Sequence, residues 1–499
     1  MTLYPRGSEW RRWDLHIHTP FTRKNDGFTG STHPSKSEEE NTSEKWDGFF
    51  TSILNYVGDM NDPLKAIYAI GITDYFSIEN YKRVIENTEL INRIPLILPN
   101  VELRLLPAAK ETPINIHCIF DSSLPVNTIE NRFLSKLNYK YNNTPYSATN
   151  NSLIQLGKAI EPTIIDDFEA EKKALEQYVV NLSDLQELFN NDKELRGKTI
   201  IVISNKSTDG ASGIGNPSTS GDISDLTALR EELYKFSDAI FSGNPSDALY
   251  FIGKKKDISA DSVKKKCGKL MPCLHGSDAH KNADLFEPDL KRYCWIKADP
   301  TFNGLRQIIF EPGERVRIAA SKPEFKPPYQ VIESVSFVDN ELFQQEPIVF
   351  NQNLNCIIGG KSTGKSLLLH NIARSIDPEQ TNDKIKYVND ADRTKSKINT
   401  LPAPEIVVRW LDSGDASGRK IIYIPQKYLN RLADDEESTT VIDDIIKKTI
   451  LSRTDVDGQR LEIAEISMQK RIDAILSDGA KNLLILYEIM VLHMSMRIK

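Results

Sequence analysis

Two pairs of candidate metal ligands stand at the ends of short apolar segments. Residues 11–20 read RRWDLHIHTP, which places His16 and His18 two apart, and LHGSDAHKN gives Asp278 and His280 the same spacing. In a β-strand, residues two apart share a face, so both members of a pair can reach one ion. Neutral imidazole and carboxylate together suit zinc, manganese or iron. The pairs predict a divalent-metal site, although a single histidine is more often a surface or hydrogen-bonded core residue.

Polar residues also interrupt three apolar segments between these pairs. Glu102 lies within LPNVELRL, His117 lies within INIHCIF, and Thr73 and Asp74 end the segment GITDYF. A charge or an imidazole in a buried strand is costly unless it is paired or bound to a metal. Glu102 and His117 are therefore further ligand candidates. For Glu102, a salt bridge with Arg104 is the alternative.

The elements that must position these residues alternate in type along the first part of the chain. AIYAIGITDY and TIIVIS are typical of buried strands, whereas SEKWDGFFTSILNYV and DDFEAEKKALEQYVVNLSDLQELF have helical periodicity. Strands that alternate with helices predict an α/β barrel or a layered sheet. Ligands at the ends of several strands would meet at the carboxyl-terminal mouth of such a barrel.

Length and composition limit the kind of protein. A chain of 499 residues predicts two or three domains, and a net charge of −7 gives no overall attraction to nucleic acid. Five scattered cysteines without a CxxC pair argue against a disulfide framework. The apolar segment NLLILYEIMVL is shorter than the roughly 20 residues of a membrane-spanning helix. We expect a cytoplasmic protein without a membrane partner.

The ordered series DLHIHT, GITDY, VELRL, INIHCIF and GSDAH resembles the PHP (polymerase and histidinol phosphatase) superfamily over most of residues 10–285. The resemblance implies a metal-dependent phosphoesterase on a distorted (β/α) barrel with two or three metal ions. It implies that one metal is held by His16, His18, Glu102 and Asp278. It also implies that Glu102 bridges to a second metal at His117, that His280 serves a third position, and that Asp14 and Asp74 orient the ligands.

Three positions depart from the pattern of the family. Tyr75, Lys24 and Asn205 stand where the family usually has histidine ligands. The first metal position keeps all its ligands, whereas the second and third are depleted, so we expect one or two metals. His33 and His275 are candidate substitutes that we do not favour.

A second motif follows a proline-rich segment, SKPEFKPPYQ at 321–330, which predicts a linker. The segment GGKSTGKS matches the phosphate-binding P-loop, between an expected strand, NCII, and an expected helix, LLLHNIARSI. Its backbone N–H groups would hold the phosphates of ATP, with Mg²⁺ at the serine hydroxyl. The predicted nucleotide-binding residues are Gly359, Gly360, Lys361, Ser362, Thr363, Gly364, Lys365 and Ser366. Gln426, after RKIIYIP, resembles the Q-loop glutamine of ABC and SMC-like ATPases.

The combination of both motifs resembles TrlF-type proteins, which fuse a PHP domain to an SMC-like ATPase, and the Ppl class of anti-phage proteins. The expected domains are a phosphoesterase domain at 1–320, the linker at 321–330, the amino-terminal lobe of a P-loop ATPase at 331–434, and a helical segment that begins a coiled coil at 435–499. No Walker B strand follows the P-loop region, so we expect the carboxyl-terminal ATPase lobe to be absent. A split gene with a partner chain, a shortened chain and a frameshift are the alternatives.

The expected function is that of a metal-dependent phosphoesterase or nuclease, regulated by ATP binding and acting on nucleic acid in bacterial anti-phage defence. Lysines near the last motif could follow a nucleic-acid backbone, although a solvated helix face is the commoner reason for such a run. We expect homo-oligomers formed through the ATPase domains and no ATP hydrolysis by this chain alone. The alternatives are an inactive sensor that binds nucleic acid or nucleotide, and a small-molecule phosphatase. The lysines are Lys254–Lys256, Lys264–Lys266 and Lys269.

Overall fold

The structure is a computed structural model that describes eleven stretches of the chain and divides it into two compact units, 1–325 and 326–499. The unit boundary falls inside the segment in which the sequence predicts a linker. The described stretches are 6–29, 38–58, 62–109, 112–206, 210–214, 223–323, 326–338, 346–361, 363–391, 405–414 and 419–425.

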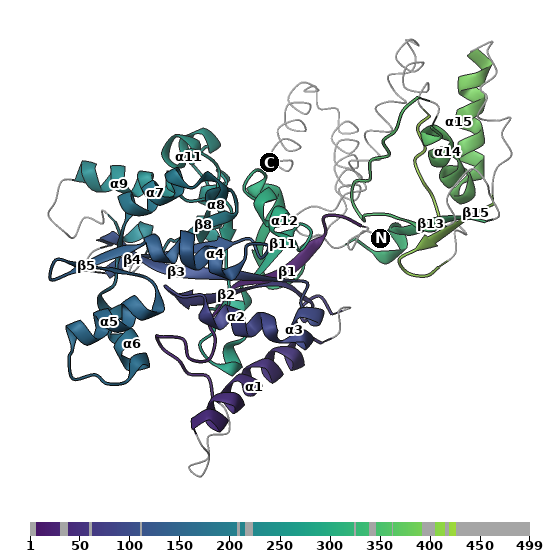
Figure 1. The fold of residues 1–499 in the computed structure, drawn as a ribbon. Coiled ribbons are helices and arrows are strands. Elements are labelled where there is room, and N and C mark those ends of the chain that lie inside the picture. The colour runs from purple at the N-terminus through teal and green to yellow at the C-terminus, as the bar shows by residue number, and fades with distance from the viewer. Residues whose placement is uncertain are drawn as a thin grey trace, which may run out of the picture. The chain divides into compact units, whose positions relative to one another are not determined.

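Unit 1 is built on one ten-stranded sheet with the order β10-β9-β8-β4-β3-β2-β1-β11-β12, and β7 pairs with β3 off this path (Figure 1). Its strands are β1 (Trp10–Ile17), β2 (Ile67–Tyr75), β3 (Leu96–Ala109), β4 (Thr112–Phe120), β7 (Val180–Asn181), β8 (Thr199–Ser204), β9 (Ala239–Phe241), β10 (Cys273–Leu274), β11 (Tyr293–Lys297) and β12 (Val316–Ala319). A separate hairpin joins β5 (Asn138–Tyr141) to β6 (Thr144–Ser147).

The segment after β10 returns to β1 and nearly closes this sheet into a barrel. Asp278 donates its backbone N–H to the carbonyl of His16 at 2.9 Å, and His18 donates to the carbonyl of Ala279 at 3.1 Å. Ile17 and Ala279 form an isolated parallel bridge. The last predicted ligand motif is thereby held beside the first.

The strand directions differ from those of a regular parallel barrel. β1, β2 and β3 are parallel, but β4 is antiparallel to both β3 and β8, and β11 is antiparallel to β1. Only two residues separate β3 from β4, too few for the crossover that a parallel pair requires. The mixed α/β class that we expected is present, with a sheet that is barrel-like and irregular.

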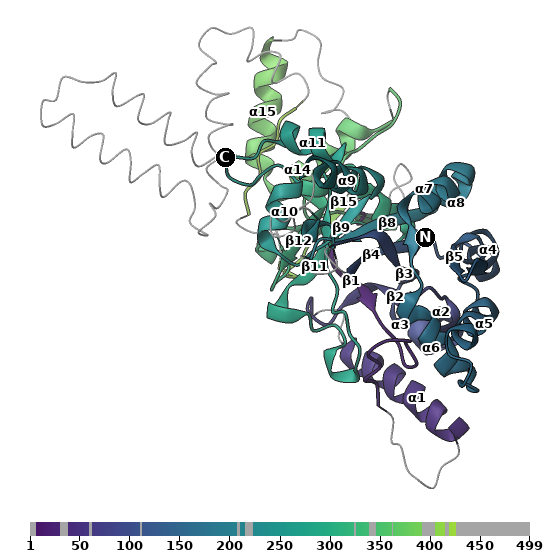
Figure 2. The ribbon, with the colours of Figure 1, turned by 90° about the vertical axis from the view of Figure 1, so that its left-hand side faces the viewer.

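Helices cover the outside of the sheet, as the two views show (Figures 1 and 2). α2 packs on β2, while α8 and α9 pack on β8. The helices of unit 1 are α1 (Glu38–Tyr56), α2 (Glu79–Glu86), α3 (Thr88–Arg93), α4 (Val126–Arg132), α5 (Asn150–Ile160), α6 (Asp167–Gln177), α7 (Leu182–Asn191), α8 (Lys193–Gly197), α9 (Ile223–Phe236), α10 (Pro245–Phe251), α11 (Ala260–Cys267), α12 (Phe302–Gln307) and α13 (Pro312–Arg315).

The long helical pattern at DDFEAEKKALEQYVVNLSDLQELF forms two helices rather than one. α6 ends at Gln177, and Tyr178 is extended and fully buried. Its hydroxyl lies 2.9 Å from the carbonyl oxygen of Leu137 and 3.0 Å from that of Tyr146. Burial of this aromatic ring against the hairpin outweighs continuation of the helix.

The inside of the barrel is filled by a second apolar core. Leu98, Ile119, Val202 and Leu274 belong to this buried cluster, together with Trp13. Barrels of this size are closed by packed side chains and leave no pore. The interior cluster therefore forms a solid floor beneath the polar residues at the strand ends.

Unit 2 contains a three-stranded antiparallel sheet with two helices. The strands are β13 (Ile332–Val338), β14 (Ile348–Val349) and β15 (Glu405–Trp410), and the helices are α14 (Lys365–Ile376) and α15 (Pro378–Ala391). NCII, expected as the strand before the P-loop, forms no strand here, and Ile358 is 90% exposed. A strand needs a neighbour for its backbone hydrogen bonds, and the described residues provide none for this segment.

The other expected strand of unit 2, RKIIYIP, is also absent as a strand. In residues 419–425 the backbone of Ile421 and Tyr423 bonds instead to the side-chain amide of Gln380 on α15. Gln426, Ser362, His33 and the helical segment at 435–499 lie outside the described residues. Among the helices that the structure describes, none is both long and apolar enough to cross a membrane.

Candidate metal centre

A β-bulge in β1 sets the direction of the first histidine pair. Asp14 pairs with Ile70 and Ile17 pairs with Ile72, so two residues, Leu15 and His16, stand opposite the single residue between them, Gly71. A bulge of this kind redirects the side chains that follow it. His16 and His18 both face the interior, as their spacing predicts.

Gly71 makes the bulge possible. A Cβ atom at this position would lie 2.3 Å from the carbonyl oxygen of Leu15, which is closer than real atoms approach. The residue is thus glycine because the bulged backbone of β1 occupies the space of a side chain.

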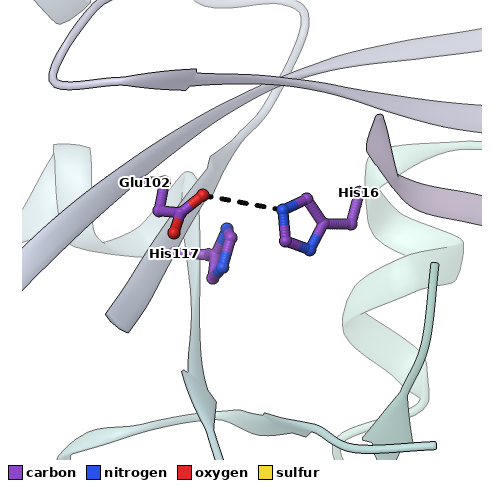
Figure 3. Close-up of side chains that lie close together, drawn as sticks. All are labelled: His16, Glu102 and His117. Atoms are coloured by element: carbon purple, nitrogen blue, oxygen red, sulfur yellow. Dashed lines mark ion pairs between the residues drawn. The ribbon is translucent and has the colours of Figure 1, made fainter. Parts of the chain in front are cut away.

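Glu102 and His117 reach the same place from adjacent strands. They are directly paired across β3 and β4, and both side chains are buried. Figure 3 shows the Glu102 carboxylate directed toward the imidazole of His16, with His117 beside both. The Oε2 atom of Glu102 lies 3.6 Å from Nε2 of His16 and 3.6 Å from Nε2 of His18. The described structure contains no ion pair between Glu102 and Arg104, and the carboxylate lies near two imidazoles instead, which favours the ligand interpretation over the salt bridge.

Asp278 enters from the segment that returns to β1. Its Oδ1 atom lies 3.2 Å from Nε2 of His16 and 3.6 Å from Nε2 of His18. Asp14 fixes this segment, since both of its carboxylate oxygens accept the backbone N–H of Ser277, at 3.0 and 3.1 Å. Asp14 thus holds the loop that carries Asp278, consistent with its expected orienting role.

Two groups of three side chains have ligand atoms close enough to share an ion. One comprises His16, Glu102 and His117, and the other comprises His16, His18 and Asp278; in each, the atoms lie within 4.8 Å of one another. His16 belongs to both groups. The resemblance instead implies that Glu102 is the shared ligand, so the described geometry gives His16 the central place.

The residues present fit a cation. Oε2 of Glu102 is buried and has no hydrogen-bond donor in the described structure. A carboxylate oxygen without a donor is costly in the interior, and a metal ion would compensate it. The side chain of Asp278 is 44% exposed while those of His18 and Glu102 are almost fully covered, so the centre is open to solvent on the Asp278 side.

The electrostatics keep most ligands in their metal-binding protonation states. Burial lowers the pKa of His18 to about 4 and that of His117 to about 3. Burial would raise the pKa of Glu102, but His117 and His16 outweigh it and lower the pKa to about 2. For His16, burial lowers the pKa, but Asp278 and Glu102 outweigh it and raise the value. Neutral imidazoles and ionised carboxylates are the forms that coordinate metals.

Asn100 orients His117 and was not singled out from the sequence. Its Nδ2 donates to the carbonyl of Leu15 at 3.0 Å and to Oγ1 of Thr73 at 2.9 Å, which leaves Oδ1 to face Nδ1 of His117 at 3.3 Å. Nδ1 of His117 must then carry the proton, and its Nε2 is free to bind a metal. Its place as a polar residue within the apolar segment LILPNVELRL could have indicated a buried role.

Thr22 supports His18 in a similar way. Its Oγ1 lies 3.3 Å from Nδ1 of His18, so the other ring nitrogen faces the centre. Tyr75 and His280 stack on the same ring, with centroids 5.0 and 4.0 Å away. His280 also has Nε2 at 3.7 Å from Oδ1 of Asp278, at the edge of the centre and outside both groups of three.

The structure places Asp74 apart from the proposed ligands. Tyr75 is paired with Glu102 and faces inward, whereas Asp74 is paired with Val101 and leaves the sheet on the other face. There Asp74 accepts a hydrogen bond from Nδ2 of Asn80 at 3.1 Å. Strand alternation therefore argues against the orienting role that the resemblance implies for Asp74.

The remaining departures from the family pattern lie near the centre or point away from it. Asn205 is held elsewhere, because its amide donates to Asp247 at 2.9 Å and accepts from the hydroxyl of Tyr234 at 2.7 Å. The ammonium of Lys24 lies 5.4 Å from the centre of the Tyr75 ring. Nε2 of His275 is buried without a partner in the described structure, and His275 is in neither group of three.

The phosphate-loop motif in unit 2 ends in a helix, as expected. α14 begins at Lys365, and Gly364 before it has a φ of 87°, a conformation that favours glycine. Nζ of Lys365 donates to the carbonyls of Gly359 and Gly360, and Oγ1 of Thr363 donates to that of Gly360. The loop thus folds around its own lysine.

Comparisons with known proteins add little. No family model matches the sequence, and no curated protein matches it. A solved structure from Bifidobacterium adolescentis, described as that of a proposed metal-dependent phosphoesterase, is similar with a TM-score of 0.25 and 12% sequence identity. That match covers 55% of this chain and 89% of the other.

Proposed function

We propose that unit 1 is a metal-dependent phosphoesterase. The observation that carries the proposal is the buried Oε2 of Glu102, which has no hydrogen-bond donor in the described structure and lies 3.6 Å from Nε2 of both His16 and His18. Manganese, zinc or iron would suit this mixture of imidazole and carboxylate ligands. A metal bound there would lower the pKa of a coordinated water and neutralise phosphate oxygens.

The chain's own residues would prepare the centre for hydrolysis. Asn100 and Thr22 fix the rings of His117 and His18, and Asp14 fixes the loop of Asp278. Such partners keep a metal site preorganised and cost affinity when they are removed. The partly exposed Asp278 marks the side from which a phosphoester would enter.

We propose nucleic acid as the substrate and anti-phage defence as the role, on the strength of the sequence resemblance. Lysines on and around α11 support a backbone contact, but three of them already face carboxylates: Lys254 with Glu314, Lys264 with Asp261 and Lys269 with Asp238. The described structure gives no such partner to Lys255, Lys256, Lys265 and Lys266. These four are the ones that remain to meet phosphates.

Unit 2 would supply nucleotide binding. The P-loop motif, the left-handed Gly364 and the start of α14 support binding of ATP phosphates with Mg²⁺. In this proposal, ATP binding to unit 2 regulates the phosphoesterase.

The test is metal content together with hydrolysis. We expect the purified full chain, reloaded with Mn²⁺, to hold one or two equivalents by elemental analysis and to cleave bis-p-nitrophenyl phosphate. His16→Ala/His18→Ala should lose both the metal and the activity. His370→Ala, which removes a buried histidine of unit 2, should lose neither.

The second candidate is a binding module without catalysis. Tyr75 occupies the inward position next to Glu102, and Asn205 donates a hydrogen bond to Asp247, so two positions at which the family usually has histidine ligands carry other residues. Failure of the wild-type chain to take up Mn²⁺, Zn²⁺ or Fe²⁺ would contradict the enzyme proposal. The module reading would then be supported by retained binding of a nucleic acid or of ATP.

A further inference from the structure

We propose that Lys24, with Arg104 beside it, is the cationic subsite that holds a phosphoryl oxygen of the substrate at the metal centre. The inference deepens the proposed function and rests on it. It assigns a role to a residue that stands where a histidine ligand was expected. In place of an additional metal ion, the chain would present an ammonium group.

Lys24 lies at the rim of the proposed metal centre. Its Nζ lies 5.4 Å from the centre of the Tyr75 ring, and that ring stacks on His18 at 5.0 Å. Lys24 therefore reaches the rim of the centre from the loop that follows β1. The ammonium thus lies beside the ring that covers His18, on a side from which a phosphate bound at the centre could be reached.

Lys24 has no ion-pair partner in the described structure. Its neighbours Arg23 and Lys45 each have one, Glu171 at 2.7 Å and Asp26 at 2.5 Å. Glu102 and Glu176 attract the ammonium from a longer distance, but burial and the nearby Arg104 outweigh them and lower the pKa of Lys24. An ammonium in such surroundings gains from an anionic ligand.

Arg104 supplies a second cation near Lys24. Arg104 lies two residues after Glu102 on β3, on the same inward face. Its Nη1 donates to the carbonyls of Leu175 and Glu176, at 3.2 and 3.1 Å, which fixes the guanidinium with other N–H groups still to be used. Lys24 and Arg104 thus bring two positive charges to one side of the centre.

The loop around Lys24 is held in place by several contacts. The loop that carries Lys24 is fixed on both sides of it, because Arg23 pairs with Glu171 and Asp26 accepts the backbone N–H groups of Phe21 and Phe28 at 2.9 and 3.2 Å. Gly27 adds a bond to the carbonyl of His280 at 2.8 Å. A preorganised cation loses little conformational freedom when a phosphate binds.

Both a phosphomonoester and a phosphodiester present the oxygen that this subsite recognises. The two substrates differ in charge, because the monoester carries a second negative charge near neutral pH. If the natural substrate is an end phosphate, replacing Lys24 should reduce hydrolysis of the monoester more than that of the diester. If it is an internal diester, hydrolysis of the diester should be reduced more.

The experiment compares Lys24→Met, Lys24→Arg and Lys65→Met in the full chain. Lys65 is a matched control, since its ammonium also lies over a tyrosine ring, that of Tyr56 at 3.6 Å. Lys65 precedes the start of β2, whereas the Tyr75 ring beside Lys24 stands at the end of β2. Binding of inorganic phosphate is measured by calorimetry with and without Mn²⁺, and bound Mn²⁺ is quantified for each variant. Hydrolysis of p-nitrophenyl phosphate and its bis ester distinguishes the two substrate types.

Lys24→Met should weaken phosphate binding about tenfold or more and raise KM, as expected for loss of a charged hydrogen bond. Its Mn²⁺ content should not change, Lys24→Arg should recover part of the affinity, and Lys65→Met should match the wild type. Equal phosphate affinity in Lys24→Met and the wild type, with Mn²⁺ bound to both, would overturn the inference and leave the phosphoesterase proposal standing. A wild type that binds no Mn²⁺ but binds phosphate through Lys24 would do the reverse.

Discussion

At the scale of single residues, the centre depends on side chains that would never touch a metal. Asn100 is the clearest case, because one buried amide contacts Leu15 on β1, Thr73 on β2 and His117 on β4. The amide thereby connects the strands and selects the tautomer of a proposed ligand. Loss of the Asn100 amide should lower the affinity for metal more than the rate of hydrolysis by the metal-loaded protein.

Replacing Asn100 by alanine should lower metal affinity about 10- to 100-fold, the usual effect of removing the partner of a ligating histidine. Asn80→Ala is the matched control, since Asn80 is also buried but bonds to Asp74 away from the centre. Titration of metal-free protein with Mn²⁺ measures both. Equal losses in the two variants would assign Asn100 a purely structural role.

Asp74 should make stability depend on pH. Burial raises its pKa to about 7, against opposing effects of Arg23 and Asn80. The folded chain then holds a proton that the unfolded chain releases above pH 4, so this residue's contribution falls as pH rises from about 4 to 7. This residue lowers the free energy of unfolding by up to about 4 kcal/mol over that pH range, and replacing Asp74 by asparagine should abolish the decrease.

Urea unfolding at pH 5 and pH 8 measures this effect. The signal is tryptophan fluorescence in a Trp410→Phe background, which leaves Trp10, Trp13, Trp46 and Trp295 of unit 1 as reporters. Asp74→Asn should stabilise the protein more at pH 8 than at pH 5. An identical effect at both pH values would show that Asp74 is ionised in the folded chain.

At the scale of elements, the bulge in β1 decides where the first two histidines point. The i, i+2 spacing predicts that His16 and His18 share a face, and they do. The same rule would place the side chain of Asp14 on the face that His16 and His18 share. The bulge at Leu15 and His16 directs Asp14 toward the backbone of Ser277 instead. Spacing alone contains no sign of the inserted residue, so this feature could not be predicted from it.

Gly71→Ala should abolish metal binding and destabilise unit 1 by several kcal/mol, because the new Cβ would collide with the backbone of Leu15. Gly197 at the end of α8 is a control, since a Cβ there would meet nothing within 4 Å. Thermal unfolding and Mn²⁺ content test both variants. Normal metal content in Gly71→Ala would contradict the proposed dependence on the bulge.

Several strands of the sheet in unit 1 were predictable from the sequence, whereas their pairing was not. β2, β3, β4 and β8 appear in the sequence as apolar segments, and Glu102 and His117 stand out within them as costly polar residues. Their direct pairing depends on the antiparallel hairpin between β3 and β4, which no local pattern specifies. Likewise NCII has the composition of a strand but, among the described residues, no neighbouring strand.

At the scale of the whole molecule, the two units should respond to different ligands. A ligand that binds only the folded state stabilises the unit that contains its site. At a concentration of 100 times its Kd, Mn²⁺ should therefore stabilise unit 1 by about 2.7 kcal/mol and raise its Tm. The Tm of unit 2 should not change. ATP with Mg²⁺ should have the opposite selectivity. Calorimetry, with fluorescence of Trp410 as the reporter of unit 2, distinguishes the transitions, and a shared shift would show that the units unfold together.

The return of the chain after β10 has a consequence for biosynthesis. The group His16, Glu102 and His117 is complete early in translation, but Asp278 follows about 160 residues later. At roughly 5–20 residues per second, the ribosome needs about 8–30 s to supply it. During that interval the nascent chain presents three ligands without their closing strand. We expect the correct ion to be secured only after Asp278 has left the ribosome, so that metal selection is a late event in the life of the newly made protein.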